Sequence, residues 1–249
     1  MSEIITLYHG NDHVLVKPLF GFGKSDNDYG SGFYTTLDKQ KAAEWAVSNG
    51  SDAAYVNIYE IDTEDLNVIH LDDYGILTWI SEIVYNRGAR GEDAIILGKK
   101  ITDQYKIDLS NADIVVGYRA DDSYSDIVDA FLQNKLNIDE VERLFKKGDL
   151  GQQYFIKSKL AFDKIKFCGF EQVNPKDFVN YSEVNARIEV SKFLKQRNNQ
   201  ILLNHFEPSG ITAVKAANEY YEYDSTYQYY FASERDISQN KEKEDFDEI

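Results

Sequence analysis

The period of the hydrophobic positions changes several times along the chain, and each change predicts a new strand or helix. Strands are expected where β-branched, aromatic and other apolar residues alternate or run together, at 4–8, 54–61, 112–117, 153–158 and 165–170. Helices are expected where apolar residues recur every three or four positions, at 39–49, 76–86, 125–134, 137–148, 159–165 and 181–196. Asp38 is predicted to cap the first helix, and a glycine- and aspartate-rich segment at 17–32 predicts a long loop before it.

The C-terminal part of the chain differs in composition from the rest. Six of the eighteen tyrosines lie between 220 and 230, and the chain ends in the acidic sequence NKEKEDFDEI. The acidic end is expected to be a solvated tail. An aromatic cluster of this kind either packs against the rest of the protein or forms a surface that binds a partner, and the sequence leaves both possibilities open.

Composition and charge exclude several classes of protein. A chain of 249 residues with 43% hydrophobic composition can bury a large core. The net charge of −16, without a cluster of Lys and Arg, predicts no general binding to nucleic acid. We expect a cytoplasmic protein without a membrane span, because no long apolar run and no signal-peptide pattern is present. The single cysteine, Cys168, excludes a disulfide within the chain and a cysteine-rich metal site, no metal is expected, and the apolar surroundings predict a buried structural thiol.

Four short motifs bring in the candidate chemistry. A His-Gly pair ends the first predicted strand, a Gly-x-Gly-aromatic-Tyr sequence opens another, a tryptophan follows eleven residues after that tyrosine on a helix, and two glutamines open a late strand. Each motif is common in purely structural roles, but their order and context argue against a chance combination. In order, the motifs are His9-Gly10, Gly30-Ser31-Gly32-Phe33-Tyr34, Trp45 and Gln152-Gln153.

Taken together, these motifs resemble the ADP-ribosyltransferase superfamily, which includes the diphtheria-type toxins and the poly-ADP-ribose polymerases. The segments 7–36, 113–124 and 150–162 also look like those of an uncharacterised bacterial family placed in the same superfamily. The resemblance covers roughly residues 3–190 and implies an α+β fold with a split, mostly antiparallel β-sheet and flanking helices. It implies an ADP-ribosyltransferase-like domain at 1–195 and a C-terminal extension at 196–249.

The resemblance also implies roles for individual residues. The superfamily breaks the bond between nicotinamide and ribose in NAD, here a substrate, through a transition state with positive charge on the ribose. His9 would hydrogen-bond a hydroxyl of the adenosine-side ribose, and Gly10 would pair its backbone with the nicotinamide carboxamide. Tyr34 and Trp45 would stack on the two faces of the nicotinamide ring. The other cofactor-binding positions implied are Gly30, Gly32 and, for the pyrophosphate, Lys24.

The late strand departs from the family pattern. A glutamate normally binds the nicotinamide-side ribose there and offsets the developing charge, whereas this chain has Gln152 and Gln153, of which the spacing favours Gln153. Glutamine lacks the charge, which would weaken transition-state stabilisation by roughly 2–4 kcal/mol, so chain elongation is not expected. The segment after 112–117 offers Arg119, Asp121 and Asp122. These residues either bring a carboxylate and other groups to the site or form a surface network with a helix cap.

The resemblance therefore predicts an NAD-dependent mono-ADP-ribosyltransferase, acting as a bacterial toxin or defence effector. Its acceptor would be an unknown macromolecule, with protein favoured by the acidic composition. Two alternatives stay open. One is an NAD glycohydrolase, which needs the same pocket without an acceptor. The other is a catalytically weak or inactive NAD-pocket protein that acts through a partner such as an antitoxin or a regulatory protein.

Overall fold

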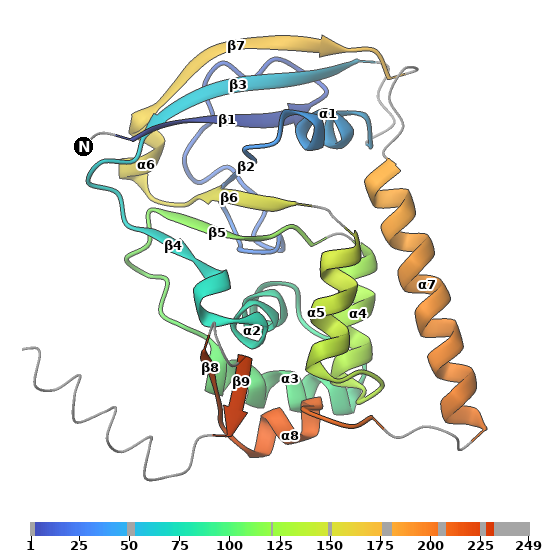
Figure 1. The fold of residues 1–249 in the computed structure, drawn as a ribbon. Helices are drawn as coiled ribbons and strands as arrows, with labels where there is room; N and C mark the ends of the chain where they lie inside the picture. The colour runs from blue at the N-terminus through green and yellow to red at the C-terminus, as the bar shows by residue number, and fades with distance from the viewer. Residues whose placement is uncertain are drawn as a thin grey trace, which may run out of the picture.

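Two β-sheets form the frame of the molecule (Figure 1). The computed structural model describes residues 3–48, 53–120, 122–148, 151–175, 181–203, 208–224 and 228–231. The first sheet is antiparallel, in the order β1-β3-β7, and consists of β1 (Ile4–Asn11), β3 (Ala54–Asp62) and β7 (Ile165–Val173). The second has the order β2-β6-β5-β4 and consists of β2 (Phe33–Thr35), β6 (Gln152–Ile156), β5 (Ile114–Tyr118) and β4 (Val68–His70).

The two sheets meet at one backbone bridge. The Tyr8 N–H donates to the Thr36 carbonyl at 2.8 Å, and the Thr36 N–H donates to the Tyr8 carbonyl at 3.0 Å. Within the second sheet β4 and β5 pair in parallel, and the other described pairs are antiparallel. The predicted α+β class with a split, mostly antiparallel sheet is therefore confirmed. The bridge, at the end of β2, also brings His9, which follows Tyr8, close to that strand.

The helices divide between the two sheets. Helix α1 (Lys39–Ser48) packs against the first sheet and is capped as predicted, because the Asp38 carboxylate accepts the Gln40 N–H at 2.8 Å. In Figure 1, α2 to α5 lie on the other side of the second sheet and α7 runs along their edge. These and the remaining elements are η1 (Leu71–Tyr74), α2 (Ile76–Arg87), α3 (Glu92–Tyr105), α4 (Asp122–Leu132), α5 (Ile138–Gly148), α6 (Lys159–Lys164), α7 (Tyr181–Leu202), α8 (Ala213–Asn218), β8 (Tyr221–Asp224) and β9 (Gln228–Phe231).

Trp79 of α2 ties the glycine-rich loop into the core. Its side chain is 1% exposed, and its Nε1 donates to the Tyr29 hydroxyl at 2.8 Å and to the Tyr118 carbonyl at 3.1 Å. The Tyr29 hydroxyl in turn donates to the same Tyr118 carbonyl at 2.6 Å. Residues 28–30 of the 17–32 loop are therefore buried and held against the end of β5, although the composition of the loop predicts an ordinary surface segment.

Several described elements fall where the hydrophobic pattern predicts none, namely η1, α3, β4, α8, β8 and β9. Helix α3 buries a narrow face that contains a glycine: Gly98 lies so close to Val84 that an added Cβ would stand 3.0 Å from its side chain. Two large apolar residues of the same helix, Ile95 and Ile96, are 55% and 58% exposed. The helix therefore lacks the apolar stripe on which a sequence-based assignment depends.

The start of the tyrosine cluster packs back onto the protein. The Tyr105 and Tyr220 rings stack with centroids 5.6 Å apart, and the Tyr105 hydroxyl accepts the Tyr221 N–H at 3.0 Å. Of the two possibilities left open, packing is the one observed for these residues; 225–227 and the acidic end lie outside the described residues. Helix α7 passes through the boundary at 195/196, and α8 packs against α3, so the predicted domain division stays a prediction.

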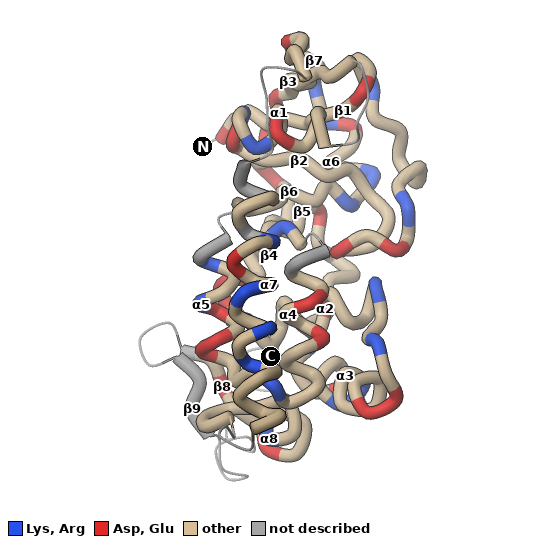
Figure 2. The backbone as a smooth tube through the Cα atoms, turned by 90° about the vertical axis from the view of Figure 1, so that its right-hand side faces the viewer, with Lys and Arg blue, Asp and Glu red and all other residues tan. Residues whose placement is uncertain are grey.

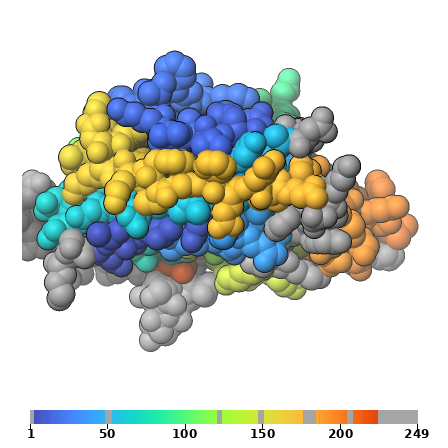
Figure 3. Space-filling model, turned by 90° about the horizontal axis from the view of Figure 1, so that it is seen from above, coloured from blue at the N-terminus to red at the C-terminus, as the bar shows by residue number. Residues whose placement is uncertain are grey.

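One prediction about the surface is wrong. Cys168 is exposed and not buried, because alternate residues of the edge strand β7 point to the solvent-facing side of the sheet. Figure 3 shows β7 running across the outside of the molecule. Acidic and basic positions are interspersed along α4, α5 and α7 in the view of Figure 2. Among the described residues, none of the helices is long and apolar enough to cross a membrane.

Candidate functional site

A cleft of about 160 Å³ opens where the glycine-rich loop, α1, the end of α2 and the adjoining ends of β5 and β6 come together. Four of the residues singled out in the sequence, namely Tyr34, Trp45, Arg119 and Gln153, lie in its wall. The strand register accounts for part of this: Tyr34 pairs with Phe155, and Gln153 lies two residues from Phe155 on the same face of β6. The complete lining is Asn27, Asp28, Tyr34, Trp45, Arg87, Arg119, Ala120 and Gln153.

His9 stands beside this cleft. Its ring lies 5.7 Å from the Trp45 ring and 4.7 Å from the Phe33 ring, centroid to centroid. Its Nδ1 is 2.7 Å from the Tyr34 carbonyl oxygen, which can only accept, so Nδ1 carries the proton. Burial lowers the pKa of His9 from 6.5 to about 4, so the ring is neutral at pH 7. The Nε2 atom is then an unprotonated hydrogen-bond acceptor.

Tyr34 is a rigid part of the wall. Its hydroxyl donates to the Gly30 carbonyl at 2.7 Å and accepts the Tyr29 N–H at 3.0 Å, and its ring lies 4.8 Å from the Phe155 ring. Burial raises the pKa of Tyr34, so the phenol stays protonated at neutral pH. The side chain, 7% exposed, therefore presents a fixed aromatic surface and no phenolate to the cleft.

The motif glycines have packing roles that explain their presence. A Cβ on Gly10 would stand 2.0 Å from the Ala42 carbonyl oxygen, so only glycine lets α1 lie this close to β1. A Cβ on Gly32 would stand 2.2 Å from the Phe155 ring. Gly30 has a φ of +84°, the left-handed conformation that favours glycine. These contacts position the cleft walls, while the implied backbone contacts to a nucleotide remain a prediction.

Trp45 and Arg119 interact with each other. The guanidinium carbon of Arg119 lies 5.2 Å from the centre of the Trp45 ring, within the range of a cation–π interaction. Trp45 lies on α1 and Arg119 follows β5, so the contact closes one side of the cleft with two elements that are distant in sequence. Arg119 covers one face of the Trp45 ring. A ligand ring that stacks on Trp45 would therefore take the place of Arg119 or use the opposite face.

The polar centre of the cleft is a pair formed by Asp28 and Gln153. The Gln153 Nε2 donates to the Asp28 Oδ2 at 2.7 Å, and both side chains are buried, with 6% and 4% of the residue exposed. The Ala120 N–H donates to the same Oδ2 at 2.9 Å, and Arg87 donates to Oδ1 at 3.1 Å. Burial raises the pKa of Asp28, and the donors around it oppose that rise.

The Asp28 carboxylate also fixes the orientation of the Gln153 amide. A carboxylate only accepts hydrogen bonds, so the NH₂ end of the amide must face it. The hydrogen bond to Asp28 is the interaction that the Gln153 side chain makes within the described residues, and it leaves Oε1 as the acceptor available to a ligand. Gln153 therefore has the geometry expected of a group that receives a hydroxyl hydrogen bond.

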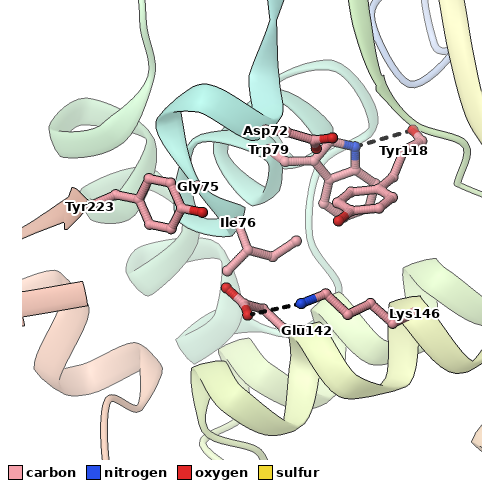
Figure 4. Close-up of a pocket in the computed structure, with 8 residues that line it drawn as sticks. All are labelled: Asp72, Gly75, Ile76, Trp79, Tyr118, Glu142, Lys146 and Tyr223. Carbon is pink, nitrogen blue, oxygen red and sulfur yellow. Dashed lines mark hydrogen bonds and ion pairs between the residues drawn. The ribbon is translucent and has the colours of Figure 1, made fainter. Parts of the chain in front are cut away.

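Gln152, the other glutamine considered for this position, lies on the opposite face of β6. Its Nε2 donates to the Asp72 carboxylate, at the edge of a second pocket of about 140 Å³. Figure 4 shows this pocket, in which Glu142 and Lys146 pair at 3.9 Å below the aromatic side chains. Its lining is Asp72, Gly75, Ile76, Trp79, Tyr118, Glu142, Lys146 and Tyr223. Gln152 is therefore outside the cleft, because neighbouring strand residues point to opposite faces.

Of three other predicted positions, the side chain of one is described, and it is absent from the cleft lining. Lys24 is exposed and is not a lining residue, and its carbonyl accepts a hydrogen bond from the Asn27 Nδ2 at 3.4 Å. Asp121 lies outside the described residues, and so does the side chain of Asp122, the first residue of α4. Whether an acid of this segment reaches the site therefore stays a prediction.

Two charged residues of the cleft, Asp28 and Arg87, escape the sequence analysis. Asp28 stands two residues before Gly30, inside the motif segment, but an aspartate in such a loop is usually solvated. Arg87 is the last residue of α2, where a basic side chain is explained by the helix dipole alone. Adjacency to the glycine motif is the one signal in the sequence that could have drawn attention to Asp28.

Comparison with known proteins places the chain in a family without supplying an activity. No curated protein and no solved structure matches it. A family model described as "Protein of unknown function (DUF3990)" matches residues 5–167, a range that contains every residue of the cleft lining. Since the match covers more than half of the 249 residues, the chain belongs to the DUF3990 family.

Proposed function

We propose that this protein is an NAD-dependent mono-ADP-ribosyltransferase that modifies a macromolecular acceptor, with protein preferred. One observation carries the proposal: Tyr34, Trp45, Arg119 and Gln153 come from four separate segments and line one cleft, with His9 against Trp45. The motifs that resemble the superfamily thus meet in space as an NAD site would require.

The size and polarity of the cleft suit one end of the dinucleotide. A volume of about 160 Å³ is smaller than the roughly 300–1,000 Å³ typical of sites that enclose a whole drug-sized ligand. The nicotinamide–ribose end would enter, and the rest of NAD would lie on the open surface beside it. The nicotinamide ring of NAD is cationic, so aromatic faces and the Asp28 carboxylate would attract it. Arg119, in place of the exposed Lys24, is the nearer cation for the pyrophosphate.

The hydrogen-bonding groups suit ribose hydroxyls. The neutral His9 offers Nε2 as an acceptor, and Gln153 offers Oε1. Each side chain is oriented by a second hydrogen bond. The His9 Nδ1 donates to the Tyr34 carbonyl, and the Gln153 Nε2 donates to the Asp28 carboxylate. Preorganised acceptors of this kind hold a sugar in one position, which favours reaction at its anomeric carbon.

The reaction is a substitution at that carbon. The bond to the nicotinamide nitrogen breaks with its electron pair, a nucleophile of the acceptor forms the new bond, and the nucleophile releases its proton. Water in place of the acceptor would give ADP-ribose and nicotinamide, which is NAD hydrolysis. The same cleft residues would support both transfer to the acceptor and NAD hydrolysis.

The experiment is to incubate the purified chain with NAD labelled in the adenosine half, with and without a cell lysate. Nicotinamide release together with label on protein supports the transferase, and nicotinamide release with free ADP-ribose alone supports the hydrolase. Trp45→Ala should abolish most turnover, whereas Tyr85→Ala, which removes a 65% exposed aromatic ring outside the cleft, should not. Absence of both NAD turnover and NAD binding by the unaltered chain would refute the proposed function.

A further inference from the structure

We propose that Asp28 is the catalytic carboxylate of this cleft and that Gln153 is its hydrogen-bond partner. The assignment rests on the proposed function and names the group that supplies the negative charge. The negative charge is then carried by Asp28 of the glycine-rich loop, and the amide by Gln153 of β6. The pair therefore provides both elements that a cationic transition state needs, a negative charge and a hydroxyl acceptor.

The composition of the cleft wall leads to Asp28. Among the described residues that line the cleft, Asp28 is the one carboxylate, and the charged side chains beside it are arginines. A transition state with positive charge on ribose gains nothing from arginine. If the cleft performs this chemistry with its own side chains, the stabilising charge comes from Asp28.

The carboxylate is held in place before any ligand binds. Its three donors come from three separate elements: Arg87 at the end of α2, Ala120 after β5, and Gln153 on β6. Two of them fill Oδ2, whereas Oδ1 accepts the single bond from Arg87. Since a carboxylate oxygen can accept two hydrogen bonds, Oδ1 has one acceptor position that no hydrogen bond within the described residues fills. The Asp28 carboxylate is thus fixed in orientation and can still accept one more hydrogen bond.

The ion pair with Arg87, whose guanidinium lies 3.1 Å from Oδ1, accounts structurally for part of the burial of this charge. A neutral asparagine at position 28 could accept the Ala120 and Gln153 bonds, but its NH₂ group would then face Arg87. An aspartate buried to 6% exposure in the wall of a cleft also resembles the acids whose environment is arranged for chemistry.

In the proposed step, Asp28 acts while the glycosidic bond breaks. The bonding electrons leave with the nicotinamide nitrogen, and the carboxylate stabilises the positive charge left on the ribose. The acceptor nucleophile then forms its bond to the anomeric carbon, and its proton passes to the free position of Oδ1 and from there to solvent. Charge and atoms balance, with nicotinamide, the ADP-ribosylated acceptor and one proton as products.

The test exchanges the two side chains. Asp28→Asn should lower kcat for nicotinamide release by roughly 10²–10³-fold, the loss typical of one preorganised electrostatic group. Gln153→Glu alone should also lower kcat, because two carboxylates within hydrogen-bonding distance cannot both ionise. The double variant Asp28→Asn/Gln153→Glu restores one charge and one amide, and should regain about tenfold or more over Asp28→Asn, since residues that act as a unit are non-additive.

Asp129→Asn is the matched control. Asp129 is partly buried and, like Asp28, accepts a backbone N–H, here from Arg90 at 3.2 Å, but it is not a lining residue of the cleft. The Asp129→Asn variant should change the free energy of unfolding but should not show the loss of kcat for nicotinamide release. Urea denaturation of every variant separates loss of folding from loss of turnover.

The outcomes are distinct. A Gln153→Glu variant more active than the unaltered chain, or turnover that survives Asp28→Asn, would overturn the role of Asp28 and leave the proposed function standing. A chain that neither binds nor consumes NAD would overturn the proposed function and this assignment together. Recovery in the double variant would support both.

Discussion

Acidification should destabilise this protein through His9. Its ring lies between Phe33 and Trp45, and burial lowers its pKa from 6.5 to about 4. Between these two pH values the unfolded chain binds a proton at His9 and the folded chain does not. Stability contributed by the neutral ring is therefore present above pH 6.5 and is lost as the pH falls towards 4.

The size of this effect follows from the difference between the two pKa values. One pKa unit corresponds to about 1.4 kcal/mol, so the lowering sets an upper limit of about 3 kcal/mol on the loss. The ring is not fully enclosed, because His9 is partly exposed as a residue, so water would reduce the value. We expect the free energy of unfolding to fall by about 1–3 kcal/mol through this group.

Urea denaturation from pH 7.5 to 4 would measure the effect in three proteins. His9→Gln removes the titrating ring and should show a flatter dependence on pH than the unaltered chain. His13→Gln removes an exposed histidine that is a lesser cause of the lowered pKa of His9, and should retain most of the dependence. Equal losses of stability in the His9→Gln variant and the unaltered chain would show that His9 is not buried as a neutral ring.

Three further predictions concern the cleft walls. Gly10→Ala should destabilise the fold by about 1–3 kcal/mol or more in urea denaturation, because the new methyl group would meet a carbonyl oxygen of α1 at 2.0 Å; unchanged stability would contradict the packing. Tyr34→Phe should cost about 1–3 kcal/mol, since the buried Tyr29 N–H loses its acceptor, and thermal unfolding against the unaltered chain would detect it. Gln153→Ala should lower NAD turnover by roughly 10²-fold or more, whereas Gln152→Ala should leave it nearly unchanged; the reverse order would show that the strand register has been assigned to the wrong glutamine.

The proposed chemistry depends on a polar pair that joins distant parts of the chain. Asp28 and Gln153 are 125 positions apart, and they meet because Tyr29 is anchored under β5 by Trp79. A substitution that removes the Trp79–Tyr29 hydrogen bond should therefore alter the cleft, although neither residue lines it. This makes the glycine-rich loop a part of the site as well as a connection between two strands.

Local pattern was sufficient for much of the fold. The alternation in β3 and the amphipathic helices α4 and α5 depend on neighbouring residues, so their existence could be predicted from the sequence. The Asp38 cap is also a local hydrogen bond. Helix α3 could not be predicted in this way, because its buried face is small and two of its isoleucines are exposed.

For the candidate site, the order of the motifs was enough to name Tyr34, Trp45 and the pair Gln152-Gln153. The segment after 112–117 offered Arg119 with two possible roles, and the tertiary structure decided which of these residues meet and what surrounds them. Only long-range packing buries Asp28 and sets Arg87 against it, since the same loop composition elsewhere would leave an aspartate in water. Likewise, the pairing of β6 with β2 and β5 separates Gln153 from Gln152, a choice between two adjacent identical residues. Sequence thus determines which groups are available, and the free energy of packing determines which of them meet, because burial and contact are properties of the whole fold.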